Sequence, residues 1–223
     1  SETVEPIAHA WYSRALASVG RLDDAYRHAV RAMELDPGHP DQAIIISRMA
    51  ITSFWLNDLE TAARYFNIAS TMQLEAPIHN MAYSMFLIRT GQYDKAVTLA
   101  KLGFAQGDLP TDWVDPVFVG LHDAESRDAS MQYLEELTAA GWFPKTIEVA
   151  LWNEFGDIDR AMSVARNVEQ NPGALELDII FVEEFKAFRQ HPEFAEFTEA
   201  IGLNEYWDSA GCKWLDDKIH CAE

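Results

Sequence analysis

The sequence has little positive charge. Its 17 Lys and Arg residues stand against 36 Asp and Glu, which gives a formal net charge of −19. Proteins that bind phosphate backbones or anionic lipid without specificity use Lys and Arg to neutralise the negative charge of these partners. We therefore expect this chain to contact no nucleic acid, and the charge favours a basic partner. A surface charge that serves only solubility is the alternative.

Long hydrophobic runs are also lacking. The densest stretches, "AIII" at Ile44 and "VFVGL" at Leu121, fall far short of the roughly 18 apolar residues that span a bilayer. We expect no membrane insertion by this chain. Because the sequence begins at Ser1 without methionine or a basic, apolar leader, we also expect it to be a processed product or part of a longer protein, with any anchor outside it.

Motifs of catalytic sites are missing as well. The sequence contains no G-x-x-x-x-G-K loop, no G-x-G-x-x-G turn, no H-E-x-x-H helix and no G-x-S-x-G turn. The adjacent carboxylates of Glu135 and Glu136 point to different sides of a predicted helix, as on a solvated face. We expect no enzyme and no cofactor. The alternative is an enzyme or small-ligand-binding protein with a pocket between the N-terminal region and the C-terminal helices.

Only two cysteines occur, Cys212 and Cys221, and the second follows His220 directly. A zinc site needs four ligands, and these three residues supply at most three. A disulfide would close a short loop at the C-terminal end and contribute about 2 to 3 kcal/mol in the chain-entropy picture. We predict the disulfide, which persists in oxidising compartments. Reduced thiols and a metal site are the alternatives.

One pattern of turn and small residues does recur. Its four clear copies lie in "GRLDDAYRHAVRAMELDPGHP", "LNDLETAARYFNIAS", "TGQYDKAVTLAKLGF" and "FGDIDRAMSVARNVEQNP". The matching positions are Gly20, Ala25, Ala29 and Ala32; Asn57, Ala62, Phe66 and Ala69; Gly91, Ala96, Ala100 and Gly103; and Gly156, Ala161, Ala165 and Val168. A further unit between the last two copies fits with Trp113 early, Ala129 at the small position and Tyr133 four residues on.

This pattern predicts paired helices. Small residues one helical turn apart let two helices approach closely, and Gly or Asn at the turn adopts a positive φ at little steric cost. Pro37 then ends the second helix of the first unit. The offset of 34 residues from Ala62 to Ala96 is the period of the tetratricopeptide repeat family, which the segment from Pro6 to Pro172 resembles. His9 and Ile46 depart from the tryptophan that is usual in the family.

The resemblance implies an all-α fold. Residues 1–172 would form an α-solenoid of about five helix-turn-helix repeats, and residues 173–223 would form capping helices and a tail. In this family the first helices line a concave face that binds protein or peptide partners. Carried over by position, that face comprises Arg14, Ser47, Ile51, Phe54, Trp55, Met81, Met85, Arg89, Phe118, His122 and Asn153.

The middle of this concave list is apolar, which disfavours a clamp for an acidic peptide end and favours an apolar partner segment. The chain's own C-terminal region could cover the same face, and a misassigned register is the third possibility. The Met81 and Met85 pair suits an adaptable apolar surface, although Met at this spacing is more often ordinary core.

The C-terminal region has another pattern. It predicts an amphipathic helix from Leu175 to Phe188, a break at His191 and Pro192, and a short helix that ends at Gly202. It also resembles the tail that closes repeat regions in bacterial signalling proteins with winged-helix regulator or adenylate-cyclase domains. The matching residues are Arg189, Pro192, Phe194, Gly202, Leu203, Tyr206, Trp207, Gly211 and Trp214.

This second resemblance implies the sensory or interaction part of a larger signalling protein that acts in transcriptional regulation or cyclase control. DNA binding or cyclase activity would belong to domains outside this chain. Such proteins often carry one membrane span, so the implied place is the periplasmic side of a membrane-anchored bacterial protein, with the cytoplasm as the alternative.

Overall fold

The computed structural model describes residues 5–72, 74, 76–167 and 175–221, and the helices up to Arg166 come in five consecutive pairs. The pairs are α1 (Pro6–Ala17) with α2 (Leu22–Leu35), α3 (Gln42–Trp55) with α4 (Leu59–Thr71), α5 (Pro77–Arg89) with α6 (Tyr93–Gln106), α7 (Val114–Phe118) and η1 (Val119–Leu121) with α8 (Arg127–Ala139), and α9 (Lys145–Glu154) with α10 (Ile158–Arg166). The predicted helical fold class is confirmed. None of the helices described is long and apolar enough to cross a membrane.

The turns within the pairs adopt the backbone conformation that the sequence predicts. Gly20, Asn57, Gly91 and Gly156 all have positive φ, between 64° and 79°. After each of these residues the next helix begins within three positions. A residue in the left-handed backbone conformation changes the direction of the chain immediately after a helix. Gly or Asn adopts this conformation at the lowest steric cost.

Residues of the pattern are buried on the second helix of their pairs. In α2, α4, α6 and α10 the buried members are Ala25, Ala29, Ala32, Ala62, Phe66, Ala69, Ala96, Ala100, Gly103, Ala161 and Ala165. At Gly103 an added Cβ would lie 3.2 Å from the Asn80 Cβ and 3.3 Å from the Pro77 carbonyl oxygen. The close approach of α5 to α6 therefore depends on glycine at this position.

The fourth pair differs by one residue from the expected register. Ala129 is exposed, whereas Ser130 and Leu134 are buried. Ser130 packs directly on Gly120 of η1, and its hydroxyl donates a 2.7 Å hydrogen bond to the Pro116 carbonyl. The prediction of Ala129 as the small position was wrong, because a hydroxyl with a carbonyl partner is as well suited to the close contact as a methyl group. Val168 and the boundary predicted between residues 172 and 173 lie outside the described residues.

The C-terminal segment is not the single amphipathic helix predicted for Leu175 to Phe188. It consists of η3 (Leu177–Phe181), η4 (Glu183–Phe185) and α11 (Lys186–Arg189), with an extended backbone at Val182. Every residue from Asp178 to Val182 is buried, which a surface helix with one apolar face does not allow. The Arg189 guanidinium stabilises this segment from inside, since Nη1 donates to the carbonyls of Ile180 and Val182 at 2.8 Å and 2.6 Å.

The end of the chain carries two short helices and a hairpin. The predicted short helix that ends at Gly202 is confirmed as α12 (Phe194–Ala200), and α13 (Leu203–Ser209) comes after it. The antiparallel strands β1 (Cys212–Leu215) and β2 (Lys218–Cys221) then pair with Cys212 opposite Cys221. Their sulfur atoms lie at the disulfide distance of 2.02 Å. The sequence predicted the cysteine pairing and missed the strands.

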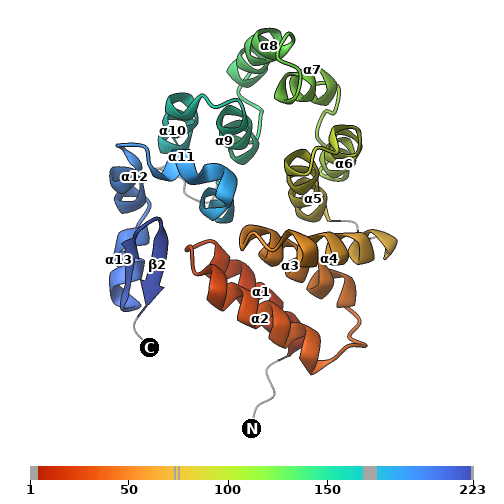
Figure 1. Cartoon of the computed structure of the whole chain (residues 1–223), viewed down its shortest axis with the longest axis vertical. Coiled ribbons are helices and arrows are strands. Elements are labelled where there is room, and N and C mark those ends of the chain that lie inside the picture. The colour runs from red at the N-terminus through yellow and green to blue at the C-terminus, as the bar shows by residue number, and fades with distance from the viewer. Residues whose placement is uncertain (1–4, 73, 75, 168–174, 222–223) are drawn as a thin grey trace.

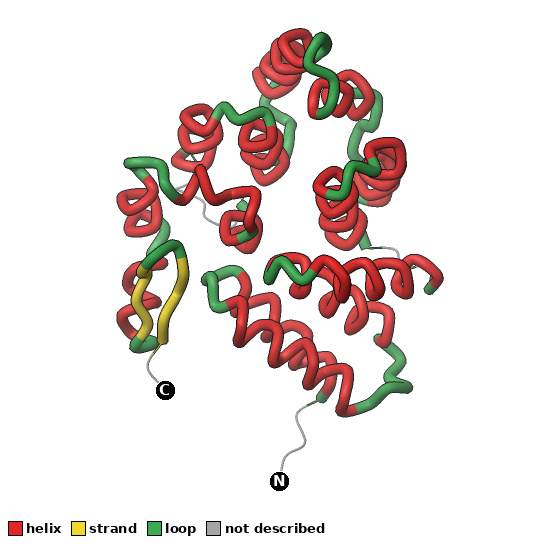
Figure 2. The backbone as a smooth tube through the Cα atoms, viewed as in Figure 1, coloured by secondary structure: helices red, strands yellow, loops and turns green. Residues whose placement is uncertain are grey.

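The helix pairs are arranged one after another around a ring that the C-terminal segment closes (Figure 1). The hairpin lies near the turn between α1 and α2 in the same view (Figure 2). Contacts among the described residues join the two ends of the chain: Trp207 Nε1 donates to the Val19 carbonyl at 2.8 Å, Arg14 pairs with Glu176, and the Phe181 ring lies beside Gly20. One hydrophobic core therefore runs from Leu16 to Cys212.

Candidate binding site on the inner face of the helix pairs

The chain's own C-terminal segment covers the middle of the predicted concave face. Trp55 Nε1 donates a 3.2 Å hydrogen bond to Asp178 Oδ2, and Asn153 Nδ2 donates a 3.0 Å bond to the Glu184 carbonyl. Arg89 Nε lies 3.3 Å from Glu184 Oε1, within ion-pair distance but without hydrogen-bond geometry. These predicted binding residues contact residues 178–184 instead of an open groove.

Other predicted site residues lie in the core or apart from the rest. Phe54 packs edge-on against Phe66 and Phe86, and Phe118 is only 7% exposed. Met81 and Met85 are partly buried against the same core. His122 is exposed and stacks on Tyr93 with a ring distance of 4.4 Å. The structure does not bring these five residues together as one surface.

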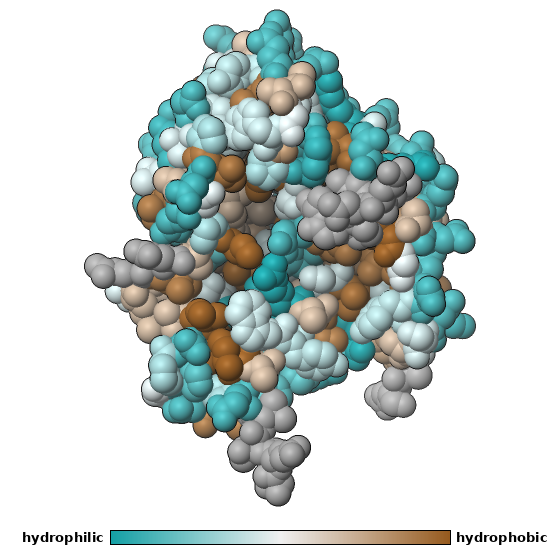
Figure 3. All heavy atoms as spheres, turned by 180° about the vertical axis from the view of Figure 1, so that it is seen from behind, coloured by the Kyte–Doolittle hydropathy of each residue, from teal (hydrophilic) through white to brown (hydrophobic). Residues whose placement is uncertain are grey.

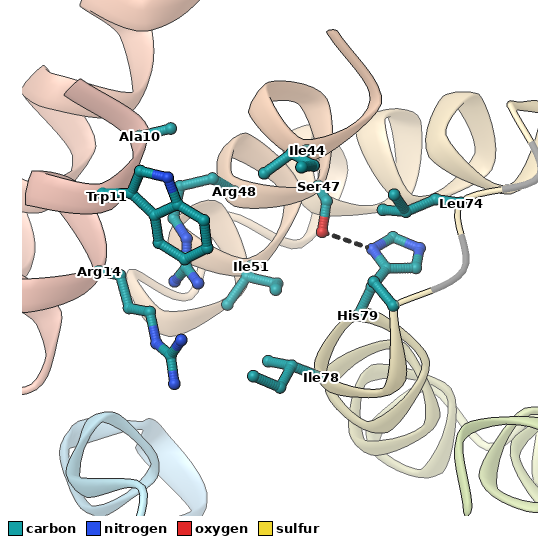
Figure 4. Close-up of a pocket in the computed structure, with 11 residues that line it drawn as sticks. Ala10, Trp11, Arg14, Ile44, Ser47, Arg48, Ile51, Leu74, Ile78 and His79 are labelled. Carbon is teal, nitrogen blue, oxygen red and sulfur yellow. Dashed lines mark hydrogen bonds between the residues drawn. The ribbon is translucent and has the colours of Figure 1, made fainter. Parts of the chain in front are cut away.

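The remaining predicted residues, Arg14, Ser47 and Ile51, meet at a pocket of about 130 Å³ between α1, α3 and α5 (Figure 4). Its lining is mainly apolar. The lining residues are Ala10, Trp11, Arg14, Ile44, Ser47, Arg48, Ile51, Leu74, Ala76, Ile78 and His79. We call this the inner-face pocket. Seen from behind, apolar side chains also gather around a hollow in the molecular surface, with hydrophilic side chains around them (Figure 3).

Two arginines give the inner-face pocket positive charge. Arg48 is only 7% exposed, and its Nη1 has no hydrogen-bond partner among the described residues. Burial lowers the pKa of Arg48 to about 10, opposed by the negative charge of Asp178, so the guanidinium remains charged at neutral pH. Arg14 Nη2 lies 2.6 Å from Glu176 Oε2 in a partly exposed ion pair. Burial also raises the pKa of Asp178.

His79 contributes a neutral polar group to the same lining. Its Nδ1 forms a 2.8 Å hydrogen bond with the Ser47 hydroxyl, and its Nε2 has no partner within the described residues. Burial lowers the pKa of His79 to about 4, so the ring is uncharged at neutral pH. Ser47, predicted as a binding residue, therefore orients His79.

Two large apolar side chains of the pocket are solvent-exposed. Trp11 is 52% exposed and Ile78 is 43% exposed, in contrast to Ile51 at 2%. Exposed aromatic and branched aliphatic side chains next to a concave apolar surface are typical of binding sites.

Sequence reasoning missed Trp11, Arg48 and His79. Arg48 lies four residues after Ile44 and three before Ile51, so helical periodicity places it on the same face as these two. That spacing was the available signal for Arg48. No comparable signal existed for the burial of His79, which depends on contacts between separate helix pairs.

A second titratable cluster lies where α9 meets the C-terminal segment. Burial raises the pKa of Glu154 to about 7, and the negative charge of Glu184 adds to this effect while Arg89 opposes it. Both carboxylate oxygens of Glu184 are buried without a hydrogen-bond partner in the part of the chain that the structure describes. Burial raises the pKa of Glu184 as well.

Within the described ranges, no group of three or more His, Cys, Asp and Glu side chains could hold a metal ion. No protein-family model matches the chain, and no curated protein matches it either.

Proposed function

We propose that this chain is a non-enzymatic interaction or sensory module of a larger bacterial signalling protein, and that a segment of its partner docks in the inner-face pocket. The observation that carries the proposal is that the C-terminal segment fills the middle of the inner face and leaves this pocket accessible, with Trp11 and Ile78 exposed beside it. Five helix pairs with a tetratricopeptide-like spacing support the same class of function.

The net charge of the chain indicates the kind of partner, and the cysteine pair indicates the compartment. A net charge of −19 favours a protein partner with a basic surface around an apolar docking segment. The cysteine pair at disulfide distance is compatible with an oxidising compartment, which supports the periplasmic side of a membrane as its place, and the cytoplasm is the alternative.

Two matched substitutions test the docking site. Ile78→Asp places a charge at the exposed rim of the pocket, and Leu102→Asp places the same charge at a site on α6 that is 46% exposed. Both variants should fold, because neither side chain is buried. We expect Ile78→Asp to abolish recovery of a specific partner from an extract of the source organism and Leu102→Asp to retain it. Equal recovery by both variants would contradict the proposal.

An enzyme remains the second candidate function, and one observation favours it. Glu154, Glu184 and Arg89 converge between α9 and the C-terminal segment, and strongly perturbed carboxyl groups are common at catalytic sites. The burial of both Glu184 oxygens argues for a structural role, since a catalytic carboxylate needs access to its substrate. A turnover activity that Glu154→Gln abolishes without loss of folding would favour the enzyme.

A further inference from the structure

We propose that the inner-face pocket binds a small organic carboxylate, with the anionic group at Arg48 and Arg14 and an aromatic or branched aliphatic body against the isoleucines. This inference rests on the proposed function, because it names the chemistry of the group that the same pocket receives.

The strongest observation is the unsatisfied guanidinium of Arg48. Buried charged groups are normally paired and hydrogen-bonded, because taking them out of water is costly. Arg48 is 7% exposed, yet its Nη1 lacks an acceptor among the residues described. A carboxylate is the acceptor that a guanidinium binds best, since its two oxygens match two parallel N–H groups.

The neighbouring carboxylates of Asp178 and Glu176 do not supply the acceptor that Arg48 Nη1 lacks. Asp178 Oδ2 accepts a hydrogen bond from Trp55, and Glu176 pairs with Arg14. Neither acid is among the residues that line the pocket. Asp178 and Glu176 therefore offset the two positive charges from outside the pocket, and Arg48 Nη1 is left without an acceptor among the described residues.

The size of the pocket limits the ligand to a small body. Its volume is about 130 Å³, and a dry apolar cavity of about 150 Å³ in another protein holds one benzene molecule. One aromatic ring or one short branched chain therefore fits, and a large cofactor does not.

The two charged groups of the pocket lie together at one side of it. Figure 4 shows the guanidinium groups of Arg14 and Arg48 near each other beside the Trp11 indole, with Ile51 and Ile78 next to them. A ligand with a charged end and an apolar body matches this arrangement. An inorganic anion would leave the apolar lining uncovered, and a neutral hydrocarbon would leave Arg48 without its acceptor.

The carboxylate could belong to a free small molecule or to the C-terminal residue of a peptide. Both sources present the same charged end and apolar body, and only the peptide continues into a polypeptide chain beyond them. Benzoate and N-acetylleucine represent the first source, and a tetrapeptide that ends in a free leucine represents the second. Benzyl alcohol and N-acetylleucinamide are the matched neutral compounds, and sulfate is the anion without an apolar body.

The test is a titration of the full chain, monitored through the indole N–H signal of Trp11 in a ¹H–¹⁵N spectrum and assigned with Trp11→Phe. We expect saturable binding of benzoate, N-acetylleucine or the free-ended tetrapeptide, at least about ten-fold tighter than that of the neutral compounds. Arg14→Met and Ile78→Asp should each weaken it by about ten-fold, whereas Leu102→Asp should leave it unchanged. Both Arg14 and Ile78 are sufficiently exposed for these variants to fold, unlike variants of Arg48.

Preference for the tetrapeptide over N-acetylleucine would identify a peptide end as the source, and the reverse preference would identify a small molecule. Equal binding of benzoate and benzyl alcohol, or no saturable shift up to about 10 mM, would overturn the carboxylate inference. The proposed function has a separate outcome: a partner that is lost on Ile78→Asp but not displaced by any carboxylate would support the interaction module and overturn only the ligand class.

Discussion

Arg189 and Asp217 are joined by two parallel hydrogen bonds, from Nε to Oδ1 at 2.7 Å and from Nη2 to Oδ2 at 2.9 Å. The Arg189 side chain is only 4% exposed, and Asp217 lies in the turn of the C-terminal hairpin with a positive φ. Because Arg189 also donates to two carbonyls around Val182, one guanidinium connects the hairpin to the segment that fills the ring.

Replacement of Arg189 by lysine should destabilise the protein, although it keeps the charge. A lysine cannot form the forked contact with Asp217 and also satisfy the carbonyls of Ile180 and Val182. We expect a loss of about 3 kcal/mol in the free energy of unfolding, measured by denaturant titration. Arg31→Lys, in the exposed ion pair with Glu34, should change it by less than about 0.5 kcal/mol. Equal effects of the two substitutions would show that Arg189 has no special structural role.

The position of Phe181 against Gly20 gives a test of ring closure. A Cβ at Gly20 would lie 2.8 Å from the Phe181 ring, whereas nothing lies within 4 Å of a Cβ at Gly91. Both glycines have similar positive φ, so Gly20→Ala and Gly91→Ala share the same backbone strain. We expect Gly20→Ala to cost at least about 1 kcal/mol more, in the manner of an overpacked core site.

The matching control is the same pair of substitutions in a Phe181→Ala background. Without the ring, the two alanine variants should cost nearly the same, because only the shared backbone strain remains. An unchanged difference in that background would mean that the C-terminal segment does not pack against this turn in solution.

The pH dependence of stability should reveal the raised pKa of the partly buried Glu154. Its folded pKa of about 7 lies above the ordinary glutamate value of 4.5, so the native state binds more protons between these pH values. This contribution to stability is complete below pH 4.5 and is lost as the pH rises through 7, by about 3 kcal/mol at most. Glu154→Gln should remove this fall, as measured by the difference between the wild-type and variant unfolding curves from pH 5 to 8.

The lowered pKa of His79 has the opposite effect on the pH dependence of stability, so its contribution must be separated from that of Glu154. Its pKa is lowered from 6.5 to about 4, so stability from neutral His79 is lost as the pH falls through this range. The comparison of wild type with Glu154→Gln cancels the His79 contribution, because both proteins contain it. A difference between them that does not change with pH would contradict the raised pKa of Glu154.

The paired cysteines should be oxidised in protein prepared without reductant. Reduction should raise the mass of the C-terminal peptide by about 2 Da, and Cys212→Ser with Cys221→Ser should lower the free energy of unfolding by about 2 to 3 kcal/mol in the chain-entropy picture. Titration of two free thiols in the unreduced protein would refute the disulfide.

Local signals in the sequence predicted the parts of the fold that depend on local geometry. Gly20 and Gly91 identified turns because a positive φ is a local requirement, and Ala96 and Ala100 identified a helix interface because small residues recur at one helical turn. These local signals did not predict the burial of residues 178–182. Residues 178–182 are buried on every side, and their burial depends on contacts with α1 and α3, which lie more than 120 positions away in sequence.

The binding site was predictable only in part for the same reason. The resemblance to the tetratricopeptide repeat family implied that Arg14, Ser47 and Ile51 lie on the inner face, and these residues do line the pocket. It could not separate them from Trp55 or Asn153, which lie on the same predicted face, because the covering segment decides which inner residues remain accessible.

The most direct test of the central claim is site-specific photocrosslinking with the complete protein in the source organism. A photoreactive amino acid at position 78 lies at the rim of the inner-face pocket, and one at position 102 has nearly the same exposure away from it. We expect a discrete crosslinked partner from position 78 and none of the same mass from position 102. The same partner from both positions, or from position 102 alone, would contradict the claim that the inner-face pocket is where this module binds.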